Sequence, residues 1–169
     1  MEYCDIMGAQ HEIPLMVSAY QKGIRNYDVD KAYEAVKKTL TTQGTALSSG
    51  GIVGNRHLDV YLKYGFVPYG EKSHHNVFGT TYEGPTSNTL EYAFDDWNAA
   101  QFAKALGYEE DYDYFTRRAY NYKNVFDSET KYVRPKYSDG TWMPDFEPIN
   151  KDEHSTSWSW LCLLYTSDA

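Results

Sequence analysis

The stretch TLEYAFDDWNAAQFAKALG, in the middle of the chain, most restricts the folds that this sequence can adopt. Its apolar side chains Leu90, Phe94 and Trp97 recur at steps of three and four residues, so they share one face of a helix. Gly107 follows the last periodic residue and is typical of the position just after a helix C-cap. We therefore predict an amphipathic helix over residues 88–106, with its apolar stripe, Trp97 included, facing the core.

Similar patterns predict an all-α fold built from helical hairpins. Further helices are expected at residues 12–24, 29–41, 58–64 and 109–126, and loops at residues 42–55, 66–84 and 127–157. Asp28 suits an N-cap, Gly23 and Gly65 suit helix ends, and no segment gives a convincing strand signal. Helix pairs are also typical of peptide-binding solenoids, but the sequence shows no fixed repeat period.

Charge and composition narrow the possible partners. The net charge of −8 argues against nucleic acid and anionic membranes as ligands. No run approaches the roughly 20 apolar residues of a membrane span. Aromatic residues make up 17% of the chain, which suits sugar-stacking platforms and equally suits Tyr-rich helices that pack together. The first residues lack the basic flank and apolar core of a signal peptide, and we expect the natural protein to begin upstream of Met1.

Three carboxylates stand close together at the start of the central helix, beside several aromatic residues. They are Glu91, Asp95 and Asp96. A carboxyl group in an apolar wall can keep its proton near neutral pH, as the acid of a sugar-cleaving site must. The alternative is a capping box, in which Asn88 is the N-cap and Glu91 reaches back to a free N–H. An acidic first turn also suits the helix dipole.

The central stretch, the segment EDYDYFTRRAYNYKNVFDSETKYVRPKYSDGTW after it, and the earlier segments HEIPLMVSAYQKGIRNYDVDKAYEAVKK and YLKYGFVPYGEK together resemble glycoside hydrolase family 92. The resemblance covers about residues 6–160. It implies a calcium-dependent, inverting exo-α-mannosidase that acts on mannose-containing glycans and is periplasmic or secreted. The family has a β-sandwich and a larger (α/α)6 barrel, so residues 1–161 would be part of that catalytic barrel. A non-catalytic helical module that binds glycan or protein is the alternative.

The resemblance also implies roles for individual residues. Glu91 matches the family's general acid, with Glu83 as the competing glutamate. Asp95 and Asp96 match paired aspartates that orient a sugar hydroxyl or brace Glu91; helix-to-helix hydrogen bonding is the alternative. The family's general base is an Asp-x-Asp pair further downstream, which we expect to lie beyond the C-terminus. Asp111 and Asp113 have that spacing but do not match.

Further sugar-contact candidates are weaker. Glu153 and His154 stand near the place of a mannose-binding glutamate, His11 matches a histidine of the family, and Trp142 lies in a long loop. The resemblance implies Ca²⁺, which needs six to eight oxygen ligands, but the sequence identifies none of them. The adjacent pair His74-His75 is a weak metal signal because it has no carboxylate at ligand spacing.

The last eight residues, 162–169, fit no pattern of the family. Their sequence CLLYTSDA can be encoded by TGTCTCTTATACACATCTGACGCT, which resembles a transposon-end adapter used in sequencing libraries. We therefore predict that this tail is artefactual. Its Cys162, with Cys4, cannot define a disulfide framework.

Overall fold

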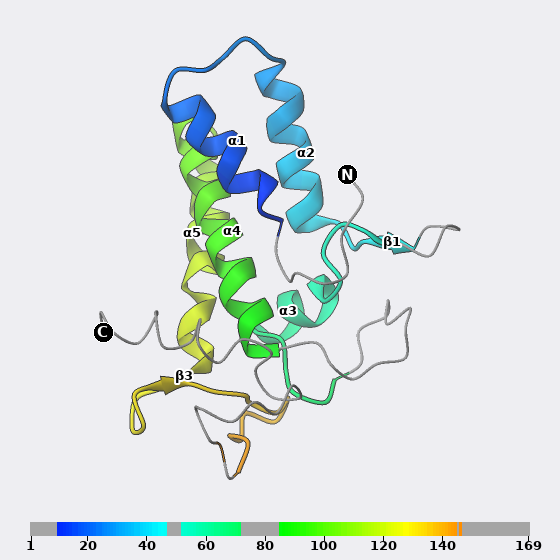
Figure 1. Ribbon diagram of the computed structural model, residues 1–169, viewed down its shortest axis with the longest axis vertical. Helices are drawn as coiled ribbons and strands as arrows, with labels where there is room; N and C mark the ends of the chain where they lie inside the picture. Colours follow the sequence, from blue (N-terminus) through cyan, green and yellow to red (C-terminus); the bar gives the residue numbers. More distant parts are fainter. Residues whose placement is uncertain (1–9, 47–51, 72–84, 145, 147–169) are drawn as a thin grey trace.

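The computed structural model describes residues 10–46, 52–71, 85–144 and 146, and in these the fold is mostly helical (Figure 1). The helices are α1 (Glu12–Gln21), α2 (Val29–Thr41), α3 (Leu58–Tyr64), α4 (Pro85–Leu106), α5 (Glu109–Ala119) and the 3₁₀ helix η1 (Tyr120–Val125). The strands are β1 (Thr45–Ala46), β2 (Ile52–Val53), β3 (Phe126–Asp127) and β4 (Tyr132–Val133). The predicted all-α class is confirmed.

The first helices begin and end where short-range chemistry predicts. Asp28 caps α2 by accepting a hydrogen bond from the Lys31 N–H at 3.0 Å. At the end of α1, Gly23 has a φ of +86°, and its N–H and that of Ile24 donate to the carbonyls of Tyr20 and Ala19. This Schellman arrangement turns the chain away from the helix before residue 24, so α1 is shorter than predicted.

Gly65 ends α3, as predicted, and has a second role in packing. Its φ is +73°, and a Cβ at this position would lie 2.9 Å from the side-chain nitrogen of Asn124. That nitrogen donates to the Gly65 carbonyl at 2.8 Å. The glycine therefore lets η1 approach the end of α3 closely.

Helix α4 begins at Pro85, one turn earlier than predicted, and the capping-box interpretation is therefore wrong. Asn88 lies inside the helix and is buried, so it cannot be the N-cap. Proline suits the first helical turn because its missing N–H would have no partner there, and its fixed φ matches the helix. The far end, at Gly107, agrees with the prediction.

Helix α4 lies at the centre of the molecule, with α1 on one side and α5 alongside it as the second arm of the predicted antiparallel hairpin (Figure 1). The main core joins α1, α2, α4 and α5 around Phe102 and Phe115, both fully buried. A second cluster packs α3 against Tyr92, and a third packs Leu90 against the β3–β4 hairpin. Because three clusters meet on it, α4 is buried around most of its circumference.

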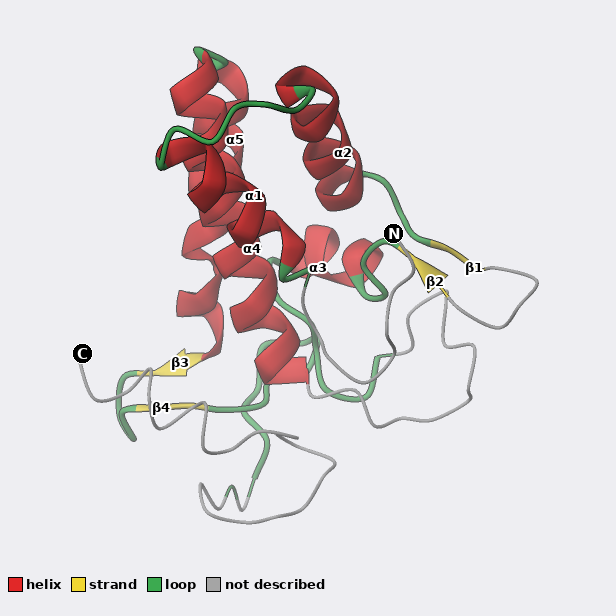
Figure 2. Cartoon of the chain, turned by 45° about the horizontal axis from the view of Figure 1, so that its top comes forward, coloured by secondary structure: helices red, strands yellow, loops and turns green. Residues whose placement is uncertain are grey.

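Two antiparallel hairpins occupy segments that the sequence predicts to be loop or helix (Figure 2). Thr45 pairs with Val53 in one, and Phe126 pairs with Val133 in the other. Strands of two residues are too short to produce an alternating pattern, so periodicity misses them. The predicted helix 109–126 also changes at Tyr120 into the tighter 3₁₀ form, which is frequent at helix C-termini.

Candidate active site

The candidate acid Glu91 lies on α4 at the edge of the buried region. Its side chain is only partly exposed, and burial raises the pKa of its carboxyl group. The exposed His11, which precedes α1, acts in the opposite direction through its charge. Helix α4 and the start of α1 thus bring Glu91 and His11, both predicted as site residues, into electrostatic contact.

Asp95 lies one helical turn after Glu91 and is completely buried. One carboxyl oxygen accepts a hydrogen bond from the Gln10 backbone N–H at 3.1 Å, and the other has no partner among the described residues. Burial raises the pKa of Asp95 well above its usual range; the Gln10 bond opposes this, and the charges of Glu91 and Asp96 add to it. No cation in the described part of the chain pairs with Asp95, so burial favours its neutral form.

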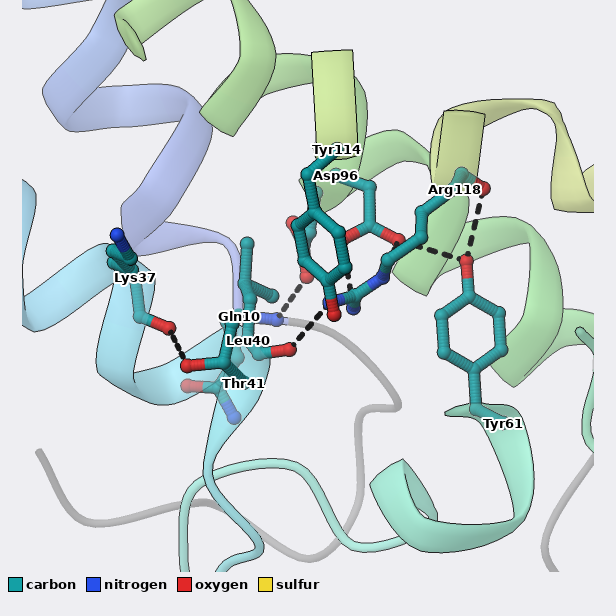
Figure 3. A network of polar contacts seen from close by, with 9 residues as sticks. Gln10, Lys37, Leu40, Thr41, Tyr61, Asp96, Tyr114 and Arg118 are labelled. Atoms are coloured by element: carbon teal, nitrogen blue, oxygen red, sulfur yellow. Dashed lines mark hydrogen bonds and ion pairs between the residues drawn. The ribbon is translucent and has the colours of Figure 1, made fainter. Parts of the chain in front are cut away.

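Asp96 is also completely buried, but its neighbours are donors from α3 and α5 (Figure 3). The Arg118 guanidinium meets both carboxyl oxygens, at 3.1 Å from Nε and 2.8 Å from Nη2. The Tyr61 hydroxyl donates to the same carboxylate at 2.8 Å. Burial raises the pKa of Asp96, and Arg118 and Tyr61 counteract this shift. These donors favour the ionised form and a bracing role.

Arg118, which lies on α5, also connects the Asp96 carboxylate to α2. Its Nη1 donates to the Leu40 carbonyl at 2.8 Å, in the last turn of α2, and to the Tyr114 hydroxyl at 3.2 Å. The guanidinium carbon also lies 5.5 Å from the centroid of the Tyr61 ring. Arg118 and Tyr61 were not predicted as site residues, because nothing in the local sequence distinguishes them from other basic and aromatic residues on helix surfaces.

The prediction that Trp97 faces the core is wrong. Its side chain is 51% exposed and that of Phe94 is 40% exposed, whereas Leu90 on the same stripe is buried. Both exposed rings line a groove of about 710 Å³ between α4, η1 and the β3–β4 hairpin. The other lining residues are mostly apolar: Leu90, Ala93, Ala119, Tyr122, Lys123, Phe126, Ser128 and Val133. Periodicity identifies the residues that share a face but not which face is covered.

Trp142, a predicted sugar-contact candidate, lies close to two cations. It forms a β-bridge with Lys136, whose ammonium group lies 4.2 Å from the Trp142 ring centroid. The Arg134 guanidinium lies 5.7 Å from the same ring. These cations compete with a sugar for the faces of the ring.

The remaining candidates are placed as follows. Asp111 on α5 forms an ion pair with Lys37 at 2.7 Å and accepts a hydrogen bond from the Tyr33 hydroxyl, so it joins α5 to α2. Within the described ranges, no three His, Cys, Asp or Glu side chains form a group that could hold a metal ion. Six predicted residues and the predicted tail lie outside the described residues: Cys4, His74, His75, Glu83, Glu153, His154 and residues 162–169.

Comparisons with known proteins agree with this picture. A model of the glycosyl hydrolase family 92 catalytic domain matches residues 1–166. An uncharacterized secreted glycosidase of Arthroderma benhamiae is 29% identical in an alignment of 141 residues that covers 76% of this chain and 17% of that protein. Among the described helices, none has the length and apolar character needed to cross a membrane.

Solved structures from Bacteroides thetaiotaomicron are also similar. A family GH92 inverting mannosidase matches 88% of this chain with a TM-score of 0.72 and 30% identity, over 18% of its own length. A family GH92 α-mannosidase matches 86% of this chain with a TM-score of 0.68 and 34% identity, over 17% of its length. The latter has also been solved with mannoimidazole. The chain thus spans less than a fifth of each of these relatives.

Proposed function

Since the chain belongs to glycosyl hydrolase family 92, we propose that it supplies the general acid, Glu91, of an exo-acting α-mannosidase that hydrolyses terminal α-linked mannose with inversion. The substrate is then a mannose-containing glycan, which fits the similarity to solved mannosidases, one of them in complex with mannoimidazole. A secreted or periplasmic location fits both this substrate and the name of the fungal relative.

One observation carries this proposal: Glu91 is a partly buried carboxyl group whose pKa is raised by burial. A general acid must hold its proton until the leaving oxygen takes it, so its pKa has to approach the working pH. Asp111 shows the contrast, because its ion pair with Lys37 contributes to lowering its pKa. Glu91 combines partial exposure with a raised pKa and can therefore both hold a proton and reach a substrate.

The reaction follows from these properties. Glu91 donates its proton to the glycosidic oxygen as the bond from that oxygen to the anomeric carbon breaks. A water molecule forms the new bond to this carbon from the opposite face, and a second carboxylate takes the proton of that water. Asp95, one turn along α4, orients a hydroxyl group or braces Glu91, and Asp96 braces the helix.

The second carboxylate would lie roughly 6.5–9.5 Å from Glu91 to leave room for the water. The spacing of Asp111 and Asp113 suits such a base, but Asp111 is bound to Lys37 and Tyr33. We therefore assign the base to a residue outside this chain. Calcium, which the family resemblance implies, needs six to eight oxygen ligands. Among the described residues no three His, Cys, Asp or Glu side chains form a group that could hold it, so we assign it no residues and no step.

The test is Glu91→Gln in the product of the complete reading frame that encodes this chain. With an unactivated α-mannoside, kcat should fall by about 10²–10⁴-fold, because the leaving oxygen is no longer protonated. In the parent, the rate should decrease as pH rises through the pKa of Glu91, and this alkaline decrease should vanish in the variant. An NMR time course should show β-mannose as the first product.

Asp113→Asn is the matched control, because Asp113 is an exposed carboxylate on α5. It should leave kcat and the pH profile unchanged. An activated aryl mannoside, which does not need protonation, should restore most of the Glu91→Gln rate. Full activity of Glu91→Gln on the unactivated substrate would rule out the assignment.

A second function, non-catalytic binding of glycan or protein, is favoured by the exposed rings of Phe94 and Trp97 in the apolar groove. It predicts that Trp97→Ala abolishes binding of a mannose oligosaccharide, whereas Glu91→Gln leaves it unchanged. Calorimetric titration of both variants distinguishes binding from hydrolysis.

A further inference from the structure

We propose that Arg118 is a positioning residue for Glu91: by holding Asp96, it fixes the rotation of α4 about its own axis and so fixes the direction of the Glu91 carboxyl group. This inference rests on the proposed role of Glu91. It concerns a residue that does not touch the substrate and acts through α4.

The Arg118 guanidinium holds Asp96 in a defined geometry. Two of its nitrogens, Nε and Nη2, face the two oxygens of Asp96 at 3.1 and 2.8 Å. The third, Nη1, bonds the Leu40 carbonyl at 2.8 Å. Because the guanidinium is planar, this fork fixes the orientation of the carboxylate as well as its distance. A lysine could not reproduce all three contacts.

Asp96 and Glu91 lie on different faces of α4. Each residue turns the helix by about 100°, so Asp96 points about 140° away from Glu91, five residues earlier. Any rotation of α4 that moves Glu91 must therefore pull Asp96 out of the fork. Tyr61 on α3 adds a third bond to the same carboxylate at 2.8 Å. Three elements other than α4 thus oppose the rotation: α2, α3 and α5.

Stability alone does not account for the buried pair of Arg118 and Asp96. Arg118 and Asp96 are 8% and 0% exposed, so both groups lose their hydration. For such pairs the desolvation penalty often cancels the attraction, and apolar replacements are frequently neutral or stabilising. What the planar guanidinium adds, with one hydrogen bond and one close ion-pair contact to the carboxylate, is one defined geometry, which an acid catalyst on the same helix requires.

The experiment replaces both charges at once, with Asp96→Leu and Arg118→Met, to keep the volume and leave no lone buried charge. A matched double variant, Lys37→Met with Asp111→Leu, removes an ion pair that joins α2 to α5 and leaves the Arg118–Asp96 pair in place. The readout is the pKa of Glu91, measured by carboxyl ¹³C NMR titration and assigned with Glu91→Gln. Circular dichroism and thermal melting establish that each variant is folded.

We expect the folded Asp96→Leu/Arg118→Met protein to lose the raised pKa of Glu91, which should fall to that of an exposed glutamate. The matched variant should keep it raised. On a mannoside, kcat should drop by about a hundredfold in the former, with KM little changed. If the double variant does not fold, Arg118→Lys, which keeps the charge and loses the fork, takes its place.

An unchanged Glu91 pKa in a folded Asp96→Leu/Arg118→Met or Arg118→Lys protein would overturn the positioning role. This readout does not require hydrolysis, so it separates the two proposals. Full activity of Glu91→Gln would reject the acid but leave the titration of Glu91 interpretable. A lost pKa shift with an active Glu91→Gln variant would establish Arg118 as positioning a residue that is not the acid.

Discussion

Asp95 and Asp96 are adjacent in sequence and equally buried, yet the two sides of α4 treat them differently. On the α5 side, Oδ2 of Asp96 accepts hydrogen bonds from the Arg118 guanidinium and the Tyr61 hydroxyl, and Oδ1 lies 2.8 Å from Nη2 of the same guanidinium as an ion pair. On the α1 side, Asp95 receives a single backbone N–H, and no cation faces it within the described structure. On the α5 side the carboxylate charge is therefore balanced by an arginine. On the α1 side the carboxyl group of Asp95, next to Glu91, has no such counter-charge among the described residues. Burial alone therefore does not decide what a buried carboxylate does; its donors do.

The largest loss of stability should come from removing the ion pair between Arg118 and Asp96. Arg118→Ala leaves Asp96 buried without its cation, which typically costs about 3–5 kcal/mol of unfolding free energy. Urea unfolding followed by circular dichroism measures this loss. Lys37→Ala is the control, because it removes a more exposed ion pair and should cost at most about 1 kcal/mol. Equal losses in the two variants would contradict the comparison.

Tyr61→Phe should have the next largest effect. It removes only the hydroxyl that donates to Asp96 at 2.8 Å and leaves the ring packed against Tyr92. A hydrogen bond to a charged group contributes about 1.5–3 kcal/mol, so we expect a loss near the lower end, since Arg118 remains. If urea denaturation of Tyr61→Phe shows no loss of unfolding free energy at pH 7, the Tyr61 hydroxyl does not stabilise Asp96 as described.

Asp95→Asn sharpens the comparison through pH. The pKa of Asp95 is raised in the folded state, so its contribution to stability is full below the pKa of the unfolded chain, about 3.9, and is lost as pH rises toward the folded value. The parent should lose up to about 1.4 kcal/mol per pH unit across that window. The amide stays neutral, so this part of the pH dependence should disappear in the variant. Thermal melts from pH 4 to 8 measure the difference.

Asp96→Asn is the counterpart in the same melts. It removes a charge that Arg118 needs, so it should destabilise the protein at neutral pH. If Asp95→Asn is as destabilising as Asp96→Asn at pH 7, the two sides of α4 do not differ as described.

The smallest effect on stability should come from replacing an exposed aromatic residue of α4. Trp97 is 51% exposed, so Trp97→Gln should change the unfolding free energy by less than about 1 kcal/mol, whereas the fully buried Phe102→Ala should cost about 3–5 kcal/mol. Trp97→Gln should also reduce binding of a hydrophobic dye to the groove. A large loss of stability in Trp97→Gln would show that this face of α4 is covered.

The comparison also explains how far the sequence could lead. Capping and stop signals are local, so the Asp28 N-cap and the ends at Gly65 and Gly107 were predictable. The Glu91, Asp95 and Asp96 cluster was visible as spacing. The pairing of Asp96 with Arg118 was not, because it depends on how two helices are rotated against each other. The exposure of Trp97 was not predictable either, because periodicity does not show which face of α4 is covered by other helices.

The early start of α4 at Pro85 has a consequence for the ionisation of Glu91. The positive end of a helix dipole holds nearby carboxyl groups in their ionised form, and this influence fades within the first turn. With Pro85 as the first helical residue, Glu91 stands in the second turn. The segment from Pro85 to Asn88 therefore places Glu91, the proposed proton donor, beyond the first turn, where the field of the helix dipole is strongest. Deleting one turn there would bring Glu91 into that field and favour an acid that has already lost its proton.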